Sequence, residues 1–250
     1  MRIPLALGGT VLFAAVALAA TGAPAPAIVT AAPAAAAPLA TADPAVTARM
    51  DPVAERGRLA SWDREGRSLV AVRGLFLPID GVALPTDTEL LPNAPRAFRA
   101  GWHEGIDFPA AAGTAVRAVA AGVIVRVDHD YLEWDRESEN IALSDAVRLG
   151  YTPASTLDRI RGRQVWIDHG HGVVTRYAHL ATVADLVVGG AVDAGAIIGS
   201  VGSSGYPDGG PHLHLEVRVG SSYLGDGLGG DGLLAAITAA FDAPVAPAGP

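Results

Sequence analysis

Short runs of alternating or apolar residues recur along the chain, and they constrain its fold more than any other feature of the sequence. Most of them are bounded by Gly, Asp or Pro, at the spacing typical of antiparallel hairpins. The runs are Ser68–Val72, Ala115–Ala120, Gly122–Asp128, Gln164–Asp168, Val173–His179, Ala196–Val201 and His212–Val219. This pattern predicts a mostly β protein, built around a compact antiparallel β-sheet domain.

A charged segment, residues 131–163, interrupts this series of strands and is predicted to be a helical insertion. Within it, Glu137–Leu149 places apolar residues among acidic ones, and Thr152 with the proline after it is a typical start for a second short helix. Short flanking helices are predicted at Met50–Ala60 and at Asp231–Phe241.

The N-terminal region has the pattern of an export signal followed by a linker. Residues 1–20 contain an uncharged apolar run directly after Arg2, with small residues near its end. Because the run is close to the length of a membrane span, an uncleaved anchor is the alternative. Residues 21–49 are almost entirely Ala, Pro and Thr, which predicts an extended linker. We therefore expect an exported, extracytoplasmic protein that contacts a membrane only if this segment stays uncleaved.

The composition excludes several classes of function. The net charge is −8, and all 18 basic residues are arginine. Such a chain offers no broad basic face for a phosphate backbone, so we expect no nucleic-acid partner. The absence of cysteine excludes disulfides, thiolate catalysis and Cys-type zinc sites. Any metal must therefore be held by His, Asp or Glu.

Two histidines, His212 and His214, lie in the strongest local motif of the chain. In a strand, residues two apart point to the same face, so both imidazoles project together while Leu213 and Leu215 point into the core. Two histidines on one face suit metal ligation, or one ligand and one proton donor. A pair without any ligand role is the alternative.

A second motif, His103-Glu104-Gly105-Ile106-Asp107, has two structural interpretations. On a helix it would be similar to the His-Glu-x-x-His zinc motif, with Glu104 as general base. The glycines and the nearby Pro109 oppose a helix, and residues four apart also share a face in an extended segment. We predict the extended form, with Glu104 pointing away. A structural hydrogen bond between His103 and Asp107 is the alternative to ligation.

The remaining histidines carry weaker signals. His179 ends an alternating strand and alone indicates no more than a half-buried strand residue. His169 and His171 lie among glycines at a predicted hairpin tip, and His129 lies in a predicted solvated turn.

Together, the two motifs would supply the ligands of a catalytic zinc site. His103, Asp107 and His214 would give two imidazoles, one carboxylate and an open position for water. His179 and His212 would then lie beside the metal as groups for proton transfer or oxyanion stabilisation.

At these residues the sequence resembles the lysostaphin-type (LytM-like) zinc metallopeptidases. The matching segments occur in the order found in that family and cover about residues 96–220. They are Gly101–Phe108, Ala120–Ile124, Val165–Gly172, Thr175–Leu180, Gly199–Gly205 and Gly210–Arg218. The resemblance implies a compact antiparallel β domain with Zn²⁺ in a groove between loops. It also implies that His103, Asp107 and His214 are the zinc ligands, and that His179 and His212 are the catalytic pair.

The resemblance further implies an exported zinc metallo-endopeptidase that hydrolyses peptide bonds in peptidoglycan stem peptides or cross-bridges by means of a zinc-activated water. Some members of the family have lost ligands and activate cell-wall amidases, so a non-catalytic cell-wall binding module of that kind is the alternative. A sugar-binding β domain with incidental histidines is a third hypothesis. None of the five site positions is substituted in this chain, which favours the enzyme. We expect it to be a monomer.

The domain organisation predicted from these observations has five parts. They are a signal peptide or anchor at 1–20, a linker at 21–49, a lead-in segment at 50–95, a metallopeptidase domain at 96–220 and a Gly-rich tail with a short helix at 221–250. Part of the lead-in, Leu75–Pro95, could form either a strand or a cover over the groove. The insertion at 131–163 could overhang the same groove.

Overall fold

The computed structural model describes residues 72–242. The predicted signal, linker and helix Met50–Ala60 lie outside the described residues. So does the predicted strand Ser68–Val72 apart from Val72, which belongs to no strand. Within residues 72–242, no helix is long and apolar enough to cross a membrane.

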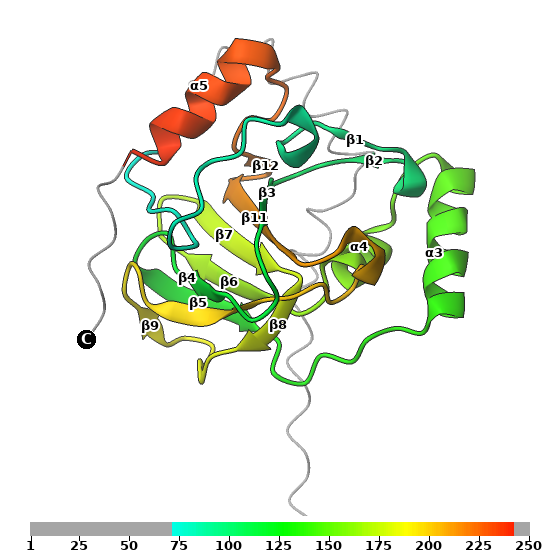
Figure 1. Cartoon of the computed structure of the whole chain (residues 1–250), viewed down its shortest axis with the longest axis horizontal. Helices are drawn as coiled ribbons and strands as arrows, with labels where there is room; N and C mark the ends of the chain where they lie inside the picture. The colour runs from blue at the N-terminus through cyan, green and yellow to red at the C-terminus, as the bar shows by residue number, and fades with distance from the viewer. Residues whose placement is uncertain (1–71, 243–250) are drawn as a thin grey trace, which may run out of the picture. The chain divides into compact units, whose positions relative to one another are not determined.

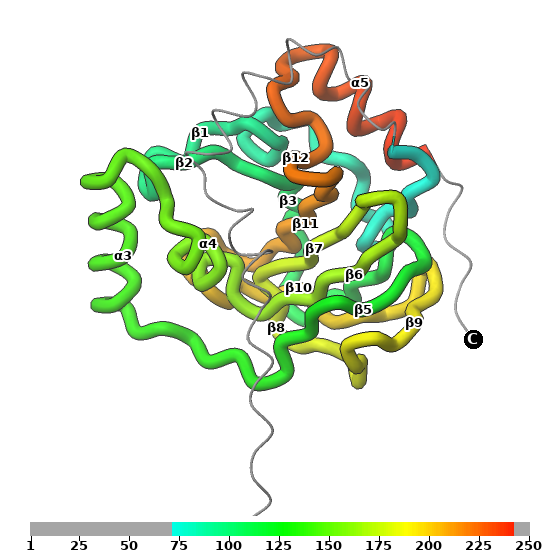
Figure 2. The backbone as a smooth tube through the Cα atoms, turned by 180° about the vertical axis from the view of Figure 1, so that it is seen from behind, coloured from blue at the N-terminus to red at the C-terminus, as the bar shows by residue number. Residues whose placement is uncertain are grey.

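Antiparallel strands form most of the described chain, as predicted (Figures 1 and 2). The largest sheet has the order β12-β11-β7-β6-β5-β9, and β3 also pairs with β11. Its strands are β3 (Ile106–Pro109), β5 (Gly122–Val127), β6 (Val165–Asp168), β7 (Val173–Ala178), β9 (Ala191–Val192), β11 (His212–Val219) and β12 (Ser222–Tyr223). A second sheet has the order β4-β10-β8, and β1 pairs with β2. These strands are β4 (Ala115–Arg117), β8 (Leu180–Val183), β10 (Ile197–Val201), β1 (Pro95–Arg96) and β2 (Gly101–Trp102).

Several strands are shorter than the sequence pattern predicts, and in two of them a backbone feature explains the early end. The strand expected at Ala115–Ala120 ends at Arg117, because the N–H of Val119 bonds to the hydroxyl of Tyr177 rather than to a neighbouring strand. The strand expected at Val173–His179 ends at Ala178, because His179 has a φ of 59°, in the left-handed region. These strands therefore end where the backbone N–H bonds to a distant residue instead of pairing with a neighbouring strand.

The alternation along β11 divides its residues between two buried environments. Leu213, Leu215 and Val217 lie in the hydrophobic core, as expected. They pack with buried residues of the other strands, including Ile106, Phe108, Ile124, Val165, Ile167, Tyr177 and Ile198. Burial of each large apolar side chain stabilises the fold by about 1.5–3 kcal/mol. The opposite face of β11 carries polar side chains, and these build the site described below.

The helical insertion predicted between β5 and β6 contains two helices, α3 (Arg136–Leu149) and α4 (Ala154–Arg161). The Asp135 side chain caps the start of α3, and Gly150 ends it in the left-handed conformation. Thr152 does not cap α4, since its hydroxyl bonds to Arg99 instead. In Figures 1 and 2, α4 lies between α3 and the strands, so the second helix is the one that reaches the sheet.

The residues before and after the matching segments also pack on the core. Leu75, Ile79 and Leu91 of the lead-in are buried, although the only regular element before β1 in the described residues is the short 3-10 helix η1 (Thr88–Leu90). The predicted C-terminal helix is present as α5 (Gly230–Ala240) and buries Leu233 and Ile237 against the same core. Two further short 3-10 helices are η2 (Ala97–Arg99) and η3 (Pro207–Gly209).

Candidate metal centre

The register of three neighbouring strands brings the two sequence motifs together. In the β11–β3 pair, Asp107 lies directly opposite His214, and in the β11–β7 pair Ala178, the residue before His179, lies opposite His214. His103 is held just before β3 by backbone hydrogen bonds to Asn93 and Ala94. The 103–105 segment is not helical, which confirms the extended interpretation.

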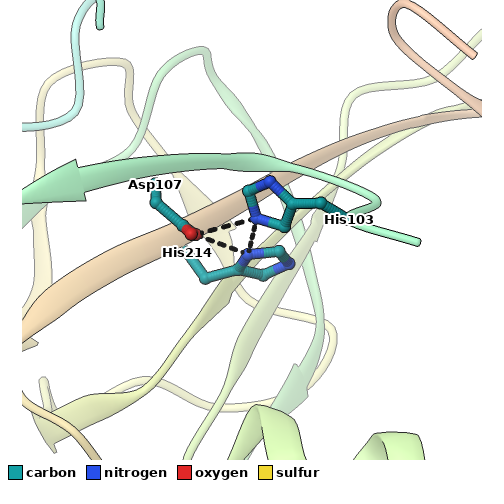
Figure 3. A group of neighbouring side chains, drawn as sticks. All are labelled: His103, Asp107 and His214. Atoms are coloured by element: carbon teal, nitrogen blue, oxygen red, sulfur yellow. Dashed lines mark hydrogen bonds and ion pairs between the residues drawn. The ribbon is translucent and has the colours of Figure 1, made fainter. Parts of the chain in front are cut away.

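His103, Asp107 and His214 form one buried cluster (Figure 3). His103 Nε2 lies 3.0 Å from Asp107 Oδ1 and 3.0 Å from His214 Nδ1. The third edge, from His214 Nδ1 to Asp107 Oδ1, is 2.8 Å. The three atoms therefore face a common point from three different backbone segments.

In each imidazole of the cluster, the nitrogen that points away from Asp107 donates a hydrogen bond to an oxygen, which fixes the orientation of the ring. His103 Nδ1 donates to the Leu91 carbonyl oxygen at 2.8 Å, and His214 Nε2 donates to Glu216 Oε1 at 3.2 Å. His103 Nε2 and His214 Nδ1 consequently face each other and Asp107, and in the neutral rings these are the nitrogens that carry lone pairs. Outer contacts of this kind typically orient histidine ligands around a metal.

The electrostatics of the cluster favour a bound cation. Burial raises the pKa of Asp107, but the neighbouring His103 and His214 outweigh this and hold it well below its usual range. Burial lowers the pKa of His214, but hydrogen bonds to Asp107 and Glu216 outweigh that effect and raise it to about 9. At neutral pH His214 Nδ1 thus carries a proton that it donates to the ionised Asp107 carboxylate, and a cation bound between the three atoms would take the place of this proton.

The donor set fits zinc. Two imidazole nitrogens and one carboxylate oxygen are ligands that zinc accepts in catalytic sites, with a fourth position left for water or substrate. The described residues contain no other group of three His or acidic side chains with this arrangement.

A pocket of about 440 Å³ opens beside the cluster. His179 and His212 line it together with the cluster residues, and their ring centroids lie 4.7 Å apart. His212 Nδ1 donates to the Gly210 carbonyl oxygen at 2.9 Å, and His179 Nδ1 donates to that of Ser204 at 2.8 Å. Both rings therefore keep Nε2 as the nitrogen with a lone pair.

His179 owes its position to the backbone around it rather than to a strand. Its N–H donates to the Arg161 carbonyl oxygen at 2.8 Å, which ties the left-handed residue to the end of α4. Burial lowers the pKa of His179 to about 3, with further lowering by His212 and His214. The imidazole is thus neutral at neutral pH.

The walls of the pocket come from residues outside the histidine motifs, some of them in the predicted insertion 131–163. Phe98 and Tyr206 stack with their centroids 4.9 Å apart, and Leu157 and Ile160 of α4 contribute an apolar wall. Arg96 Nη2 lies 3.3 Å from Asp107 Oδ2, so strand β1 reaches the cluster. Neighbouring aromatic, apolar and cationic groups suit a peptide with a charged end or side chain better than a purely apolar ligand.

The remaining histidines lie away from this pocket. His169 bonds to the Ala121 carbonyl oxygen and the Thr175 hydroxyl, and His171 is exposed in the turn between β6 and β7. His129 bonds to the Leu186 carbonyl oxygen. None of the three lines the pocket.

Sequence reasoning missed a group of buried charges beneath the cluster. Glu216 and Arg218 share the histidine face of β11, and Arg161 comes from the end of α4. The alternation of β11 is a signal that could have placed Glu216 beside His214. No local pattern indicates Arg161, because its partners are distant in the sequence.

Comparison with known proteins identifies the family. The family model described as peptidase family M23 matches residues 101–225, which include all five candidate site residues. The chain belongs to peptidase family M23. This result confirms the resemblance that the six matching segments indicated. The cluster of His103, Asp107 and His214 therefore lies within a domain of this peptidase family.

Curated relatives match part of this M23 chain. The DD-carboxypeptidase/endopeptidase Mpg of Neisseria meningitidis serogroup B is 37% identical over 117 residues, and so is the protein of that name from Neisseria gonorrhoeae. The match covers 47% of this chain and 20% of each relative. The chain therefore spans about a fifth of the length of these relatives.

Solved structures of M23-type peptidases are also similar in part. Lysostaphin from Staphylococcus simulans has a TM-score of 0.44 at 22% identity, covering 72% of this chain and 61% of that one. A zinc containing peptidase from Vibrio cholerae has a TM-score of 0.43 at 21% identity, covering 70% and 41%.

Proposed function

We propose that the chain is an exported zinc metallo-endopeptidase that hydrolyses peptide bonds in peptidoglycan stem peptides or cross-bridges. The observation that carries this proposal is the cluster of His103, Asp107 and His214, whose ligand atoms converge beside two further histidines in a pocket. Membership of family M23 and the name of the Neisseria relatives support a peptidase. The apolar run at residues 3–20 supports export.

In this proposal His103, Asp107 and His214 hold the zinc ion. When bound, zinc supplies Lewis-acid chemistry: it polarises the scissile carbonyl and lowers the pKa of a water from 15.7 towards about 7. The contacts at Nδ1 of His103 and Nε2 of His214 hold both rings in the ligating orientation, and only the proton on His214 Nδ1 would be displaced by zinc. The chain thus presents its ligands preorganised.

The proton transfers belong to His179 and His212. One of them accepts the proton of the attacking water through Nε2 and returns it to the leaving amine, and the other stabilises the oxyanion. Their Nδ1–H groups donate to backbone carbonyl oxygens, so Nε2 is the nitrogen of each ring that is available for proton transfer. Because the pKa of His179 is lowered to about 3 by burial, this ring is neutral at neutral pH.

The walls of the pocket fit a peptide substrate. Leu157, Ile160 and the stacked Phe98 and Tyr206 offer apolar contact, and Arg96 offers a cation near the cluster. Peptidoglycan peptides carry small apolar side chains and free carboxylates, which match these two kinds of wall. We propose that the protein acts as a monomer and without nucleic-acid partners, the latter in keeping with its net charge of −8.

Two substitutions separate metal binding from catalysis. His214→Ala is expected to lose stoichiometric zinc, because it removes one of three ligands. His212→Ala is expected to keep zinc but to lower kcat by about 10²–10⁴-fold, the range typical of a general acid or base. His171→Ala, at the exposed turn, serves as control and should leave both properties unchanged. Zinc content and the rate of cleavage of a cross-linked muropeptide measure the two effects, and full activity of His212→Ala would contradict the assignment.

A further inference from the structure

The charged side chains beneath the metal cluster form a connected, buried network. Glu216 is fully buried and lies beside His214 on the polar face of β11. Arg161 Nε donates to Glu216 Oε1 at 2.6 Å, on the same carboxylate oxygen that accepts His214 Nε2–H. The other oxygen, Oε2, lies 3.4 Å from Arg176 Nη1 and 3.6 Å from Arg218 Nη1. The oxygen that orients His214 is therefore held by Arg161.

Arg161 also contacts the backbone segment that carries His103. Its Nη2 donates to Glu104 Oε2, and Glu104 directly follows His103 in the chain. Because the Arg161 guanidinium has several donors in a rigid plane, it can bind both carboxylates at once, which a lysine ammonium does less well. One side chain thus joins the segments of two metal-cluster histidines.

The backbone of Arg161 makes the third connection. Its carbonyl oxygen accepts the N–H of His179 at 2.8 Å, where the chain is in the left-handed conformation. Arg161 is the last residue of α4 and belongs to the inserted segment 131–163. A residue of the insertion is therefore in contact with each of the three segments that carry the histidines of the site, namely residues 103–104, the residue His179 and β11.

Burial and charge explain why this contact is strong. The Arg161 side chain is only 3% exposed and that of Glu216 only 1%. Three arginines surround the Glu216 carboxylate, and its Oε1 accepts the His214 Nε2–H at 3.2 Å. This contact fixes the orientation of the ring and keeps Nδ1 in the cluster.

We propose that Arg161 is a positioning residue of the metal centre, which fixes the orientation of His214 through Glu216 and anchors the helical insertion to the site. The inference rests on the proposed zinc site but not on the identity of the substrate. The Arg161 side chain bonds to the Glu216 and Glu104 carboxylates rather than to the cluster atoms. Its effect on His214 is assigned to Glu216, the carboxylate that contacts this ring.

A double-mutant cycle on the full chain tests this route. Arg161→Met is expected to weaken zinc binding by about 10–100-fold, the range typical when an outer partner of a metal ligand is removed. In the Glu216→Gln background the same substitution is expected to have little further effect, because the route through the carboxylate is already lost. Competition with a chromophoric chelator gives the zinc affinity, and the visible absorption of the Co²⁺-loaded protein reports the ligand geometry.

Matched variants distinguish positioning from simple stabilisation. Arg161→Lys keeps the charge and should recover part of the zinc affinity, whereas Arg148→Met, on the exposed part of α3, should change nothing. If Arg161→Met does not fold, Arg161→Lys takes its place in the cycle. Wild-type zinc affinity and an unchanged Co²⁺ spectrum in a folded Arg161 variant would overturn the proposal, as would equal losses in both backgrounds. These readouts need no peptidase activity, so failure of the proposed enzyme function would be seen separately.

Discussion

The carbonyl oxygen of Leu91 and the carboxylate of Glu216 fix the orientation of the two histidine rings in the cluster. The first contact comes from the lead-in, 12 residues before His103, and the second from β11, two residues after His214. The five candidate residues could be predicted because strand alternation and the family's motifs place them. The contacts that orient them could not, because Leu91 acts through its backbone and Arg161 acts across a distance of 55 residues from Glu216.

Gly105 provides a test of how tightly the site is packed. A Cβ at this position would lie 2.6 Å from the Leu215 carbonyl oxygen and 2.9 Å from a ring carbon of His214. Gly105→Ala should therefore push the 103–105 segment away from β11, lower the free energy of unfolding by about 1–3 kcal/mol and weaken zinc binding.

Gly232→Ala is the matched control for that substitution, because nothing lies within 4 Å of its Cβ. In α5 this change should be neutral or stabilising. Urea denaturation and chelator competition measure both variants. Zinc affinity in Gly105→Ala equal to that of the wild type would show that the segment can yield without disturbing His103.

Among the elements, the longer alternating strands and α3, α4 and α5 were predictable, since each has a clear period or end signals. The strands β1, β2, β9 and β12 have two residues each, too few to show any alternation. The position of α4 against the site was not predictable either. It depends on close backbone contacts, in which Gly162 and Gly205 meet without side chains between them.

Gly205 tests the contact between α4 and the loop before β11. Its φ is 78°, and a Cβ would lie 2.4 Å from the carbonyl oxygens of Arg159 and Ile160. Gly170 has the same φ of 78° with nothing within 4 Å. Gly170→Ala should cost about 1–2 kcal/mol of unfolding free energy from backbone strain alone. Gly205→Ala should cost about 1–3 kcal/mol more.

The Gly205 substitution should also lower peptidase activity, because Ser204 holds His179. Equal destabilisation of the two variants in chemical denaturation would mean that the loop moves freely away from α4.

The contacts of Asp158 on α4 predict that the free energy of unfolding depends on pH. Burial raises its pKa, but hydrogen bonds from Arg126 on β5 and from Gln164 outweigh this and lower it. A carboxylate whose pKa is lower in the folded state stabilises the fold above its unfolded pKa, and the stabilisation is lost as the pH falls through the folded pKa.

The free energy of unfolding of Asp158→Asn should therefore be lower than that of the wild type near neutral pH, and the difference should shrink in acid. Denaturation curves across this pH range measure it, with Asp231→Asn at the exposed start of α5 as control. A difference that stays constant with pH would contradict the assignment.

For the whole described molecule, the core extends beyond the segments that match the family. Leu75 and Ile79 before β1 and Ile237 in α5 belong to the same buried cluster as the central strands. The backbone N–H of Leu75 donates to the Ala240 carbonyl oxygen, so the two ends of the described chain are joined. Family resemblance could not predict this, because it covers only about residues 96–220.

Ile237→Ala tests whether α5 contributes to global stability. The side chain is 2% exposed, so its truncation should lower the free energy of unfolding by about 2–5 kcal/mol. Leu234→Ala, at a partly buried position on the same helix, should cost less. A single cooperative urea transition is expected for both variants. A separate early transition, with the wild-type midpoint retained for the rest of the molecule, would show that α5 folds independently.

The measurement that tests the central claim most directly is the digestion of defined, cross-linked muropeptides by the purified chain, read by mass spectrometry. The protein is compared as isolated, after metal removal, and after addition of one equivalent of zinc. We expect cleavage with the gain of one water per bond cut, its loss on metal removal and its recovery with zinc. Cleavage that survives complete metal removal would contradict the account. So would stoichiometric zinc without cleavage of any wall peptide, and stimulation of a partner amidase in that case would establish the non-catalytic alternative.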